Sequence, residues 1–472
     1  MQRHHLWVWT VLSASVLSGC ATLSEDGGLH QVSELTRERI AQPVALQRDA
    51  AQTETAQARV AELLRAPLTA DSAVEVALLS NRELQSQLAI LGIAEADLVR
   101  AGRLRNPGFS FGRLSGNGSV EYDRTVMFDL LGLLTMPMAR RIEQQRFERA
   151  QLQAAQDAIA LAAHTRRAFF NAVGAQEQLS YMQQVKETAD IANELAKRMV
   201  QAGNFNRLTH MREQAFYADT TAQLARAQQQ ALADRERLTR LLGLTGIQAK
   251  FQLPERLPEL PKQALPVRGA EQTAMDKRLD IQIAKLQAEA LAHTLGLTRS
   301  SRFVNVLQVG YQNKSESGGQ GSEGYEVSLE LPIFDFGTAR VARAEASYLQ
   351  AMNRVAALGV QAQSEVRESH AAYRTAYELA RHYRDEVVPL RKRISEENLL
   401  RYNGMLISVF ELLADAREQV ASVSNAVVSL RDFWVSQVNL DIALTTGSPL
   451  AGLASAASPS APTATPTAAA GH

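Results

Sequence analysis

The sequence predicts a mainly α-helical fold that carries a small amount of β-structure, and two observations carry this prediction. The chain is rich in Ala, Gln, Arg, Glu and Leu but only 6% aromatic, which suits long, closely packed helices. Residues 338–401 form a stretch of about 64 residues with no convincing helix break, which as a helix would be about 95 Å long. Since a globular domain cannot bury such a rod, we expect an extended helical assembly.

Charge and motif content argue against several classes of protein. The 472 residues include 50 basic and 50 acidic side chains, so the formal net charge is +0 and no domain is strongly basic. A nucleic-acid partner is therefore not expected. The histidines show no repeated ligand spacing and no phosphate-binding loop is present, so we expect neither a metal nor another cofactor.

The first 19 residues have the pattern of a secretory signal peptide. Arg3 precedes an apolar run over residues 6–17, which is too short to span a bilayer. The run ends in Leu17-Ser18-Gly19-Cys20, which resembles the lipobox of bacterial lipoproteins; an ordinary cleaved signal with an incidental cysteine is the alternative. The resemblance implies acyl chains, such as palmitate, on Cys20. Residues 20–68 are polar and weakly patterned, and we expect them to form a lipid-anchored arm.

Residues 69–246 form the first of two similar halves. A helix is expected from the Thr69-Ala70-Asp71 cap to Arg103. Alternating patterns predict strands at about 108–114 and 120–130. Thr135-Met136-Pro137 is then expected to open a long helix that ends near Gln201, followed by a turn and a helix over about 206–242.

The same order recurs after a proline-rich linker at 247–268. The second half, 269–446, contains a helix over 269–298, strands at about 303–312 and 325–333, the long helix and a last helix over 408–444. The two halves predict an internal two-fold repeat that arose by duplication. Residues 447–472 are Ala, Pro, Ser and Thr with little else, a composition typical of a disordered tail.

The four strands have one apolar and one polar face. In the last strand Tyr325, Val327 and Leu329 alternate with Glu326 and Glu330. Strands of about ten residues can cross a bilayer at a tilt, but only as a closed barrel. Four strands cannot close; two chains would give a filled eight-stranded barrel, whereas three would leave a channel. The acidic residues expected in its lumen are Glu121, Asp123, Glu326 and Glu330.

Several motifs together resemble the TolC-like outer-membrane efflux family. They are the lipobox, the repeated halves, the junction Leu331-Pro332-Ile333-Phe334-Asp335-Phe336-Gly337, and the turn Arg401-Tyr402-Asn403-Gly404. The resemblance covers about residues 69–446, and the OprM-like and CusC-like lipoprotein branch is the most similar. The first half departs from the pattern at Asp129-Leu130-Leu131-Gly132.

The resemblance implies a homotrimer in the cell outer membrane. A transmembrane β-barrel with four strands per chain would continue into a long α-helical coiled-coil barrel, which forms a tunnel across the periplasm. The tunnel tip would contact a periplasmic membrane-fusion adaptor and an inner-membrane pump of the RND type. The residues assigned to the tip, the gate and adaptor docking are Gly203, Asn204, Arg401, Tyr402, Asn403 and Gly404.

The resemblance implies a passive export duct, to which the sequence offers two alternatives. Gly108-Phe109-Ser110-Phe111-Gly112 matches the G-x-S-x-G hydrolase motif, but here it alternates like a strand and precedes another strand, so no enzyme is expected. The other alternative is a membrane-anchored periplasmic coiled-coil lipoprotein, structural or adaptor, without a pore. Such a protein has no use for four alternating strands.

Overall fold

The computed structural model describes residues 22–447 apart from 117–118, 204–206, 267–268, 305, 318, 320 and 331–335. The predicted signal peptide, Cys20, Asn204, the 331–335 junction and the tail beyond Gly447 therefore lie outside the described residues. The described chain is mainly helical and contains one four-stranded sheet. Among its helices, none is long and apolar enough for a membrane span.

The chain divides into two compact units. The described part of unit 1 comprises residues 22–162, 239–252 and 279–361, and that of unit 2 comprises residues 163–238, 253–278 and 362–447. Three helices contribute residues to both units: α6 (Leu130–Gln201), α7 (Arg207–Leu242) and α10 (Thr338–His382).

Unit 1 begins with helices in the segment that was expected to be a weakly patterned arm. The helices are α2 (Leu29–Ile40) and α3 (Ala50–Leu63). Val32, Ile40 and Val44 are buried in the same core as residues of later helices. These few apolar residues are enough to dock the segment, because each fully buried one contributes about 1.5–3 kcal/mol of transfer free energy.

The first expected helix is interrupted at Asn81, so the prediction of one continuous helix from 69 to 103 was wrong. The chain forms α4 (Ala70–Ser80), with the expected cap at Thr69, and then α5 (Arg82–Ala101). Asn81 has ψ 113°, and its side-chain Oδ1 accepts from the Leu84 N–H at 3.0 Å. Its amide donates to the Leu241 carbonyl at 2.9 Å. A single Asn thus caps the second helix and holds it against another segment.

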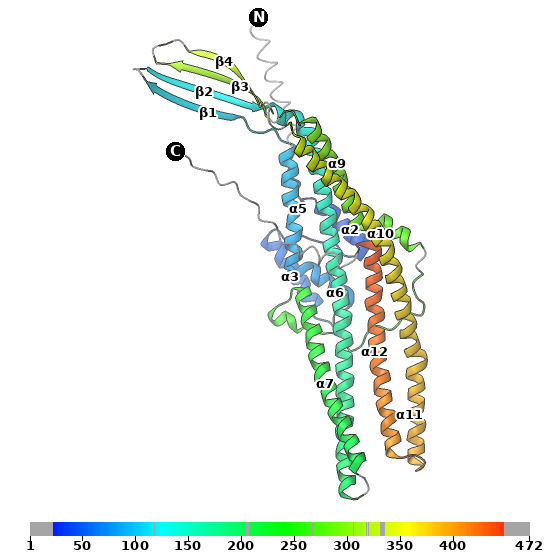
Figure 1. The fold of residues 1–472 in the computed structure, drawn as a ribbon. Coiled ribbons are helices and arrows are strands. Elements are labelled where there is room, and N and C mark those ends of the chain that lie inside the picture. The colour runs from blue at the N-terminus through cyan, green and yellow to red at the C-terminus, as the bar shows by residue number, and fades with distance from the viewer. Residues whose placement is uncertain are drawn as a thin grey trace. The chain divides into compact units, whose positions relative to one another are not determined.

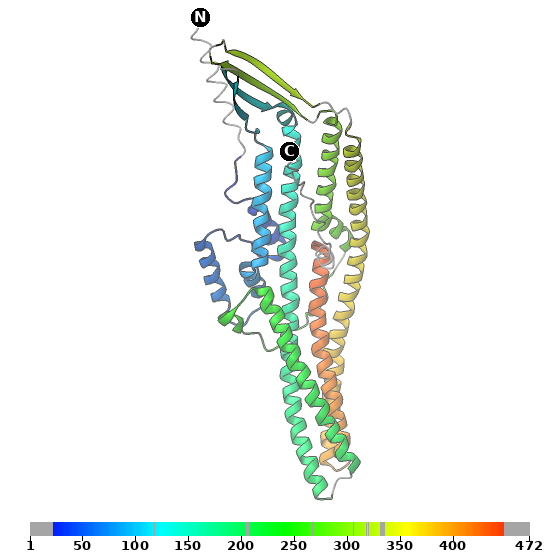
Figure 2. The ribbon, with the colours of Figure 1, turned by 60° about the vertical axis from the view of Figure 1, so that its left-hand side comes forward.

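The sheet contains β1 (Gly108–Gly116), β2 (Ser119–Asp129), β3 (Leu307–Glu316) and β4 (Ser322–Leu329). All neighbours are antiparallel in the order β1-β2-β3-β4, as Figures 1 and 2 show. The third strand begins four residues later than expected. Strands β1 and β4 are the edges, and each has an unpaired backbone edge within the described chain.

Helix α6 begins directly at the end of β2, which corrects the predicted start at Thr135. Asp129 caps the helix, because its Oδ1 accepts from the Gly132 N–H at 2.8 Å. Pro137 therefore lies inside the helix rather than at its start. In the second half, α9 (Leu279–Ser300) leads into β3.

Unit 2 contains the rest of α6 and α10 with α7 (Arg207–Leu242), α8 (Ala270–Lys277), α11 (Val388–Asn403) and α12 (Val409–Thr445). Residues 239–242 at the end of α7 belong to unit 1. The aromatic core of unit 2 is built on Tyr373, Tyr377 and Phe433. The Tyr377 hydroxyl donates to the Lys262 carbonyl at 2.9 Å, which fastens the proline-rich linker to this core.

The long helix of the second half is not uniform, in contrast to the prediction. A π-helical turn, Tyr383–Val387, separates α10 from α11, and Pro389 lies in the first turn of α11. A proline lacks the N–H that an α-helix needs and clashes with the preceding turn, which a wider turn relieves. Hydrogen bonding from Arg384 lowers the pKa of Asp385 within this turn.

A second interruption separates α8 from α9 at Arg278, where one helix was expected. Arg278 has ψ 126° and its side chain is fully buried. Its guanidinium donates to Glu365 at 2.8 Å and to the Ala443 carbonyl at 3.3 Å. A buried arginine requires such partners, so this residue joins three segments of unit 2.

Candidate functional site

The strand register of the sheet places large apolar side chains in rows on one face. Phe109, Val126, Tyr311 and Tyr325 lie directly across from one another. In the single chain this face is open, with Phe109 69% and Tyr325 87% exposed. Exposed apolar surface of this extent marks contact with a membrane or another protein.

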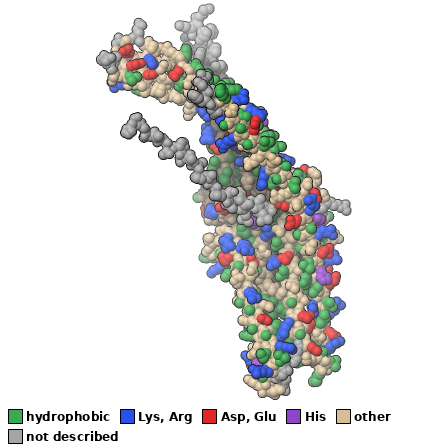
Figure 3. Space-filling view, in the orientation of Figure 1, with side chains coloured by type: hydrophobic (Ala, Val, Ile, Leu, Met, Phe, Trp, Pro, Cys, Tyr) green, Lys and Arg blue, Asp and Glu red, His purple; other side chains and the backbone are tan. Residues whose placement is uncertain are grey.

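The opposite face of the sheet carries the acidic residues that were predicted for a lumen. Glu121 and Asp123 on β2 and Glu326 on β4 fall on this face by strand alternation and register. Figure 3 shows acidic side chains gathered on one face of the sheet. Glu330 lies just beyond β4, and its N–H donates to the Val306 carbonyl at 3.2 Å.

Polar contacts fix the side chains of this acidic face. The Gln312 amide donates to both carboxylate oxygens of Asp123, at 2.9 and 3.1 Å. The Lys314 amine lies 3.9 Å from both Glu121 and Asp123. Glu316 pairs with Glu121 across the strands and adds an acid that the sequence reasoning missed. The alternation of β3 would have found it had that strand been placed four residues later.

The second group of predicted residues lies at two helix–turn–helix ends of unit 2. Figures 1 and 2 show the α6–α7 turn and the α11–α12 turn at the same end of this unit. At the first, Gly203 has φ +75° and its N–H donates to the Val200 carbonyl at 3.0 Å. This is the left-handed conformation expected of a glycine that ends a helix.

The second turn reaches the same geometry with a different residue. Arg401, Tyr402 and Asn403 form the last turn of α11, but Gly404 has φ −78° and the left-handed residue is Met405, at φ +60°. The Leu406 N–H donates to the Arg401 carbonyl at 2.8 Å, and the Met405 N–H to the Tyr402 carbonyl at 2.9 Å. These are the two bonds of a Schellman motif, in which Met405 rather than Gly404 takes the left-handed position.

The tip of the second turn is apolar and exposed. Met405 is 93% and Leu406 78% exposed, and α12 then starts from a capping box between Ser408 and Glu411. A non-glycine residue in the left-handed region costs about 1–2 kcal/mol. The chain therefore holds two large apolar side chains in water on a strained turn, which is typical of a docking surface.

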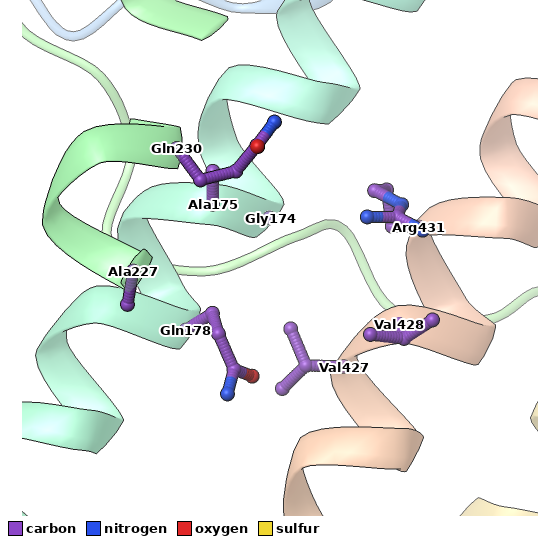
Figure 4. Close-up of a pocket in the computed structure, with 8 residues that line it drawn as sticks. All are labelled: Gly174, Ala175, Gln178, Ala227, Gln230, Val427, Val428 and Arg431. Atoms are coloured by element: carbon purple, nitrogen blue, oxygen red, sulfur yellow. The ribbon is translucent and has the colours of Figure 1, made fainter. Parts of the chain in front are cut away.

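The cavity shown in Figure 4 lies in unit 2 between α6, α7 and α12. It has a volume of about 70 Å³, and its lining includes Gly174, Gln178, Val427 and Arg431. A Cβ on Gly174 would lie 3.3 Å from the Arg431 side chain, so glycine permits this close approach. The lining contains no carboxylate or histidine, and the cavity is small, so its geometry suits helix packing rather than catalysis.

The G-x-S-x-G motif forms the first five residues of β1, where Ser110 pairs with Thr125. A nucleophile elbow requires a sharp strand-to-helix turn, which this antiparallel strand does not provide. Among the described residues, no group of three or more His, Cys, Asp or Glu side chains is placed to hold a metal ion.

Comparisons with known proteins give a result at the level of structure only. No protein-family model and no curated protein matches the chain. A membrane protein from Pseudomonas aeruginosa matches with a TM-score of 0.69 and 20% identity, over 79% of this chain and 93% of that one. CusC, whose structures concern transmembrane channel formation, matches with a TM-score of 0.66 and 19% identity, over 80% and 92%.

A third solved structure is the open state of the MtrE outer-membrane channel from Neisseria gonorrhoeae. It has a TM-score of 0.65 and 19% identity, over 79% of this chain and 88% of that chain. These likenesses confirm, for the fold, the resemblance that the sequence motifs indicated. The chain has the fold of the TolC-like outer-membrane channels.

Proposed function

We propose that this protein is the outer-membrane channel of a tripartite efflux system. It is a passive duct that carries substrates from an inner-membrane pump and a periplasmic adaptor to the cell exterior. The observation that carries this proposal is the open-edged, two-faced sheet on long helices, in a fold shared with outer-membrane channels.

Three copies of the chain would close the sheet into a twelve-stranded barrel. Strands β1 and β4 leave unpaired backbone groups at both edges, which lipid would not tolerate. In a closed ring the exposed row around Phe109 and Tyr325 would face lipid, and Glu121, Asp123 and Glu326 would face the lumen. An acidic lumen favours the passage of cations.

Cys20 would anchor each copy to the outer membrane through its acyl chains. The described chain begins two residues later, and the Ser24 N–H donates to the buried carboxylate of Glu95 at 2.6 Å. Ser24 is thus held against α5, and this position agrees with an anchor at Cys20 in the same membrane.

The two helix–turn–helix ends would form the tunnel tip. Gly203 lies at one of these ends and Arg401 to Gly404 lie at the other, and in a trimer these ends, together with Asn204, would recur as six hairpins around one axis. The exposed Met405 and Leu406 offer an apolar edge to the adaptor. Adaptor binding would open the gate by shifting the balance between two packings that differ by a few kcal/mol.

A gene duplication accounts for the order of the elements. Helix, helix, strand, strand and long helix follow one another twice. The interruption at Asn81 and the one at Arg278 occupy corresponding places before α5 and α9. A pore-less coiled-coil lipoprotein would leave the sheet without a role, so this alternative is not favoured.

Planar-bilayer recordings test the duct. The purified protein should conduct, and loosening the tip with Arg401→Ala plus Tyr402→Ala should raise the conductance. Asp123→Lys plus Glu326→Lys should shift the selectivity from cations toward anions, because both side chains would line the lumen. No conductance in the wild type and in the loosened tip would refute the proposed function.

A further inference from the structure

A dense group of arginines surrounds the end of the sheet where strands meet helices in unit 1. The described stretches 97–107, 129–143, 299–304, 306, 330 and 336–345 contain nine arginines, no lysine and five carboxylates. The whole chain has equal numbers of basic and acidic residues, so this excess is local. We call these arginines the collar, and all nine are exposed.

Large apolar side chains lie among the collar arginines. Leu104 is 55%, Leu134 71%, Phe303 50% and Phe336 56% exposed. Figure 3 shows basic and hydrophobic side chains next to one another where the sheet meets the helices. Exposed leucine and phenylalanine beside arginine is the composition of a surface at the boundary between acyl chains and headgroups.

One part of the collar forms an open pocket of about 420 Å³. Arg100, Arg103 and Arg105 line it together with Leu104 and the start of α6, and the charged lining also includes three carboxylates: Asp97, Asp129 and Glu143. Arg100 pairs with Asp97 at 3.0 Å and Arg105 with Asp129 at 3.1 Å, which orients both guanidinium groups. Each side chain is still about four-fifths exposed, so guanidinium N–H donors remain available to a further anion.

The N-terminal segment gives an independent position for the membrane. Ser24 is bound to Glu95 on α5, and the four residues from Cys20 to Ser24 can span at most about 14 Å. Along α5, Arg100 lies five residues beyond Glu95, which is about 7.5 Å. The level of the collar is therefore within reach of acyl chains on Cys20.

We propose that the collar binds the anionic headgroups of phospholipids in the periplasmic leaflet, with a phosphate held by Arg100, Arg103 and Arg105. Arginine suits this role because its planar fork binds phosphate oxygens bidentately. Leu104 and Leu134 would lie against the adjoining acyl chains. The inference rests on the proposed function, since it requires the sheet to be in the outer membrane.

Lipid binding by the purified protein tests the proposal. A fluorescent short-chain phosphatidylglycerol is titrated into the protein in zwitterionic detergent, and phosphatidylcholine of equal chain length serves as the neutral lipid. The triple variant Arg100→Gln, Arg103→Gln, Arg105→Gln should bind phosphatidylglycerol about 100-fold more weakly, because each basic residue contributes a factor of about five. The same three positions changed to Lys should keep most of the affinity and show that the triple change is compatible with folding.

A matched control removes equal charge elsewhere. Arg212→Gln, Arg226→Gln and Arg374→Gln lie on exposed positions of unit 2 and should leave phosphatidylglycerol binding unchanged. Equal losses of phosphatidylglycerol affinity in the two triple variants would show that only net charge matters, and would overturn the proposal. Full competition by equimolar inorganic phosphate, or equal affinity for phosphatidylcholine, would also overturn it. If conductance persists while lipid preference is absent, this inference fails and the proposed channel function stands.

Discussion

The effect of a substitution in the sheet or in the core of unit 2 depends on the surroundings of the side chain. Val327 pairs with Val309 on the apolar face and is 66% exposed, whereas the adjacent Ser328 belongs to the polar face. Arg278 is fully enclosed and ion-paired. The same substitution can therefore have different effects at two neighbouring positions of one strand. It can likewise have different effects on the stability of unit 2 at a buried and at an exposed ion pair.

A charge on the apolar face should impair membrane assembly. Val327→Arg would place a guanidinium in the acyl region at a cost of about 2–4 kcal/mol near the midplane. The matched change Ser328→Arg, one residue away, should be tolerated because it faces water. Heat-resistant trimer in outer-membrane fractions is the measurement, and equal yields of both variants would refute the assignment of faces.

Removing the buried arginine should destabilise unit 2. Arg278→Ala leaves Glu365 without its buried partner and should cost about 3–5 kcal/mol of the free energy of unfolding. Arg367→Ala, which breaks the exposed pair with Glu271 in the same unit, should have little effect. Thermal unfolding followed by circular dichroism checks both; an unchanged Tm in Arg278→Ala would show that the pair contributes no net stability.

At the scale of elements, periodicity in the sequence predicted most of the helices and all four strands, whereas their breaks were missed. The interruptions at Asn81 and Arg278 depend on partners far along the chain: Leu241 in one case, Glu365 and Ala443 in the other. Local sequence patterns cannot predict these contacts, because the partners lie far apart in the sequence. The early start of α6 could have been predicted from the sequence, because Asp129 is a good helix cap. Pro137 instead suggested a start that was several residues too late.

The two tip turns give a prediction about backbone conformation. Gly203→Ala forces alanine to φ +75° and should destabilise the turn by about 1–2 kcal/mol, although no atom lies within 4 Å of the added Cβ. Gly404→Ala should be nearly neutral, because φ is −78° there and the nearest atom lies at an ordinary 3.5 Å. Hydrogen exchange of the flanking helix ends measures the effect, and equal protection losses in the two variants would contradict the assigned geometry.

Replacing the left-handed Met405 by glycine should stabilise its turn, whereas Gly203→Ala should destabilise the other turn. Met405→Gly relieves the strain at φ +60° and should stabilise the α11–α12 turn by about 1 kcal/mol. If Met405 also docks the adaptor, cross-linking to that protein should fall while the turn becomes more stable. A rise in both stability and cross-linking would show that the apolar tip is not the docking edge.

For the whole molecule, the four-stranded sheet with two open edges is the feature on which the proposed assembly of several copies rests. Alternation in the sequence was enough to predict the two faces, including Glu121, Asp123 and Glu326, because a period of two needs no knowledge of the partners. Glu316 was missed through a shift in one strand boundary. The left-handed Met405 could not have been predicted, because glycine is the usual residue there and Gly404 precedes it.

The central claim is that copies of this chain complete the sheet through its two edges, and disulfide trapping tests it most directly. In a Cys20→Ser background, Ser110→Cys on β1 is combined in turn with cysteine on β4 at Gly324, Glu326 or Ser328. Oxidation in membranes should yield a covalent trimer for at least one β4 position. The control Thr125→Cys with Gln312→Cys joins two central strands and should give only monomers. Monomers in every edge combination, with the control disulfide formed, would contradict the shared barrel.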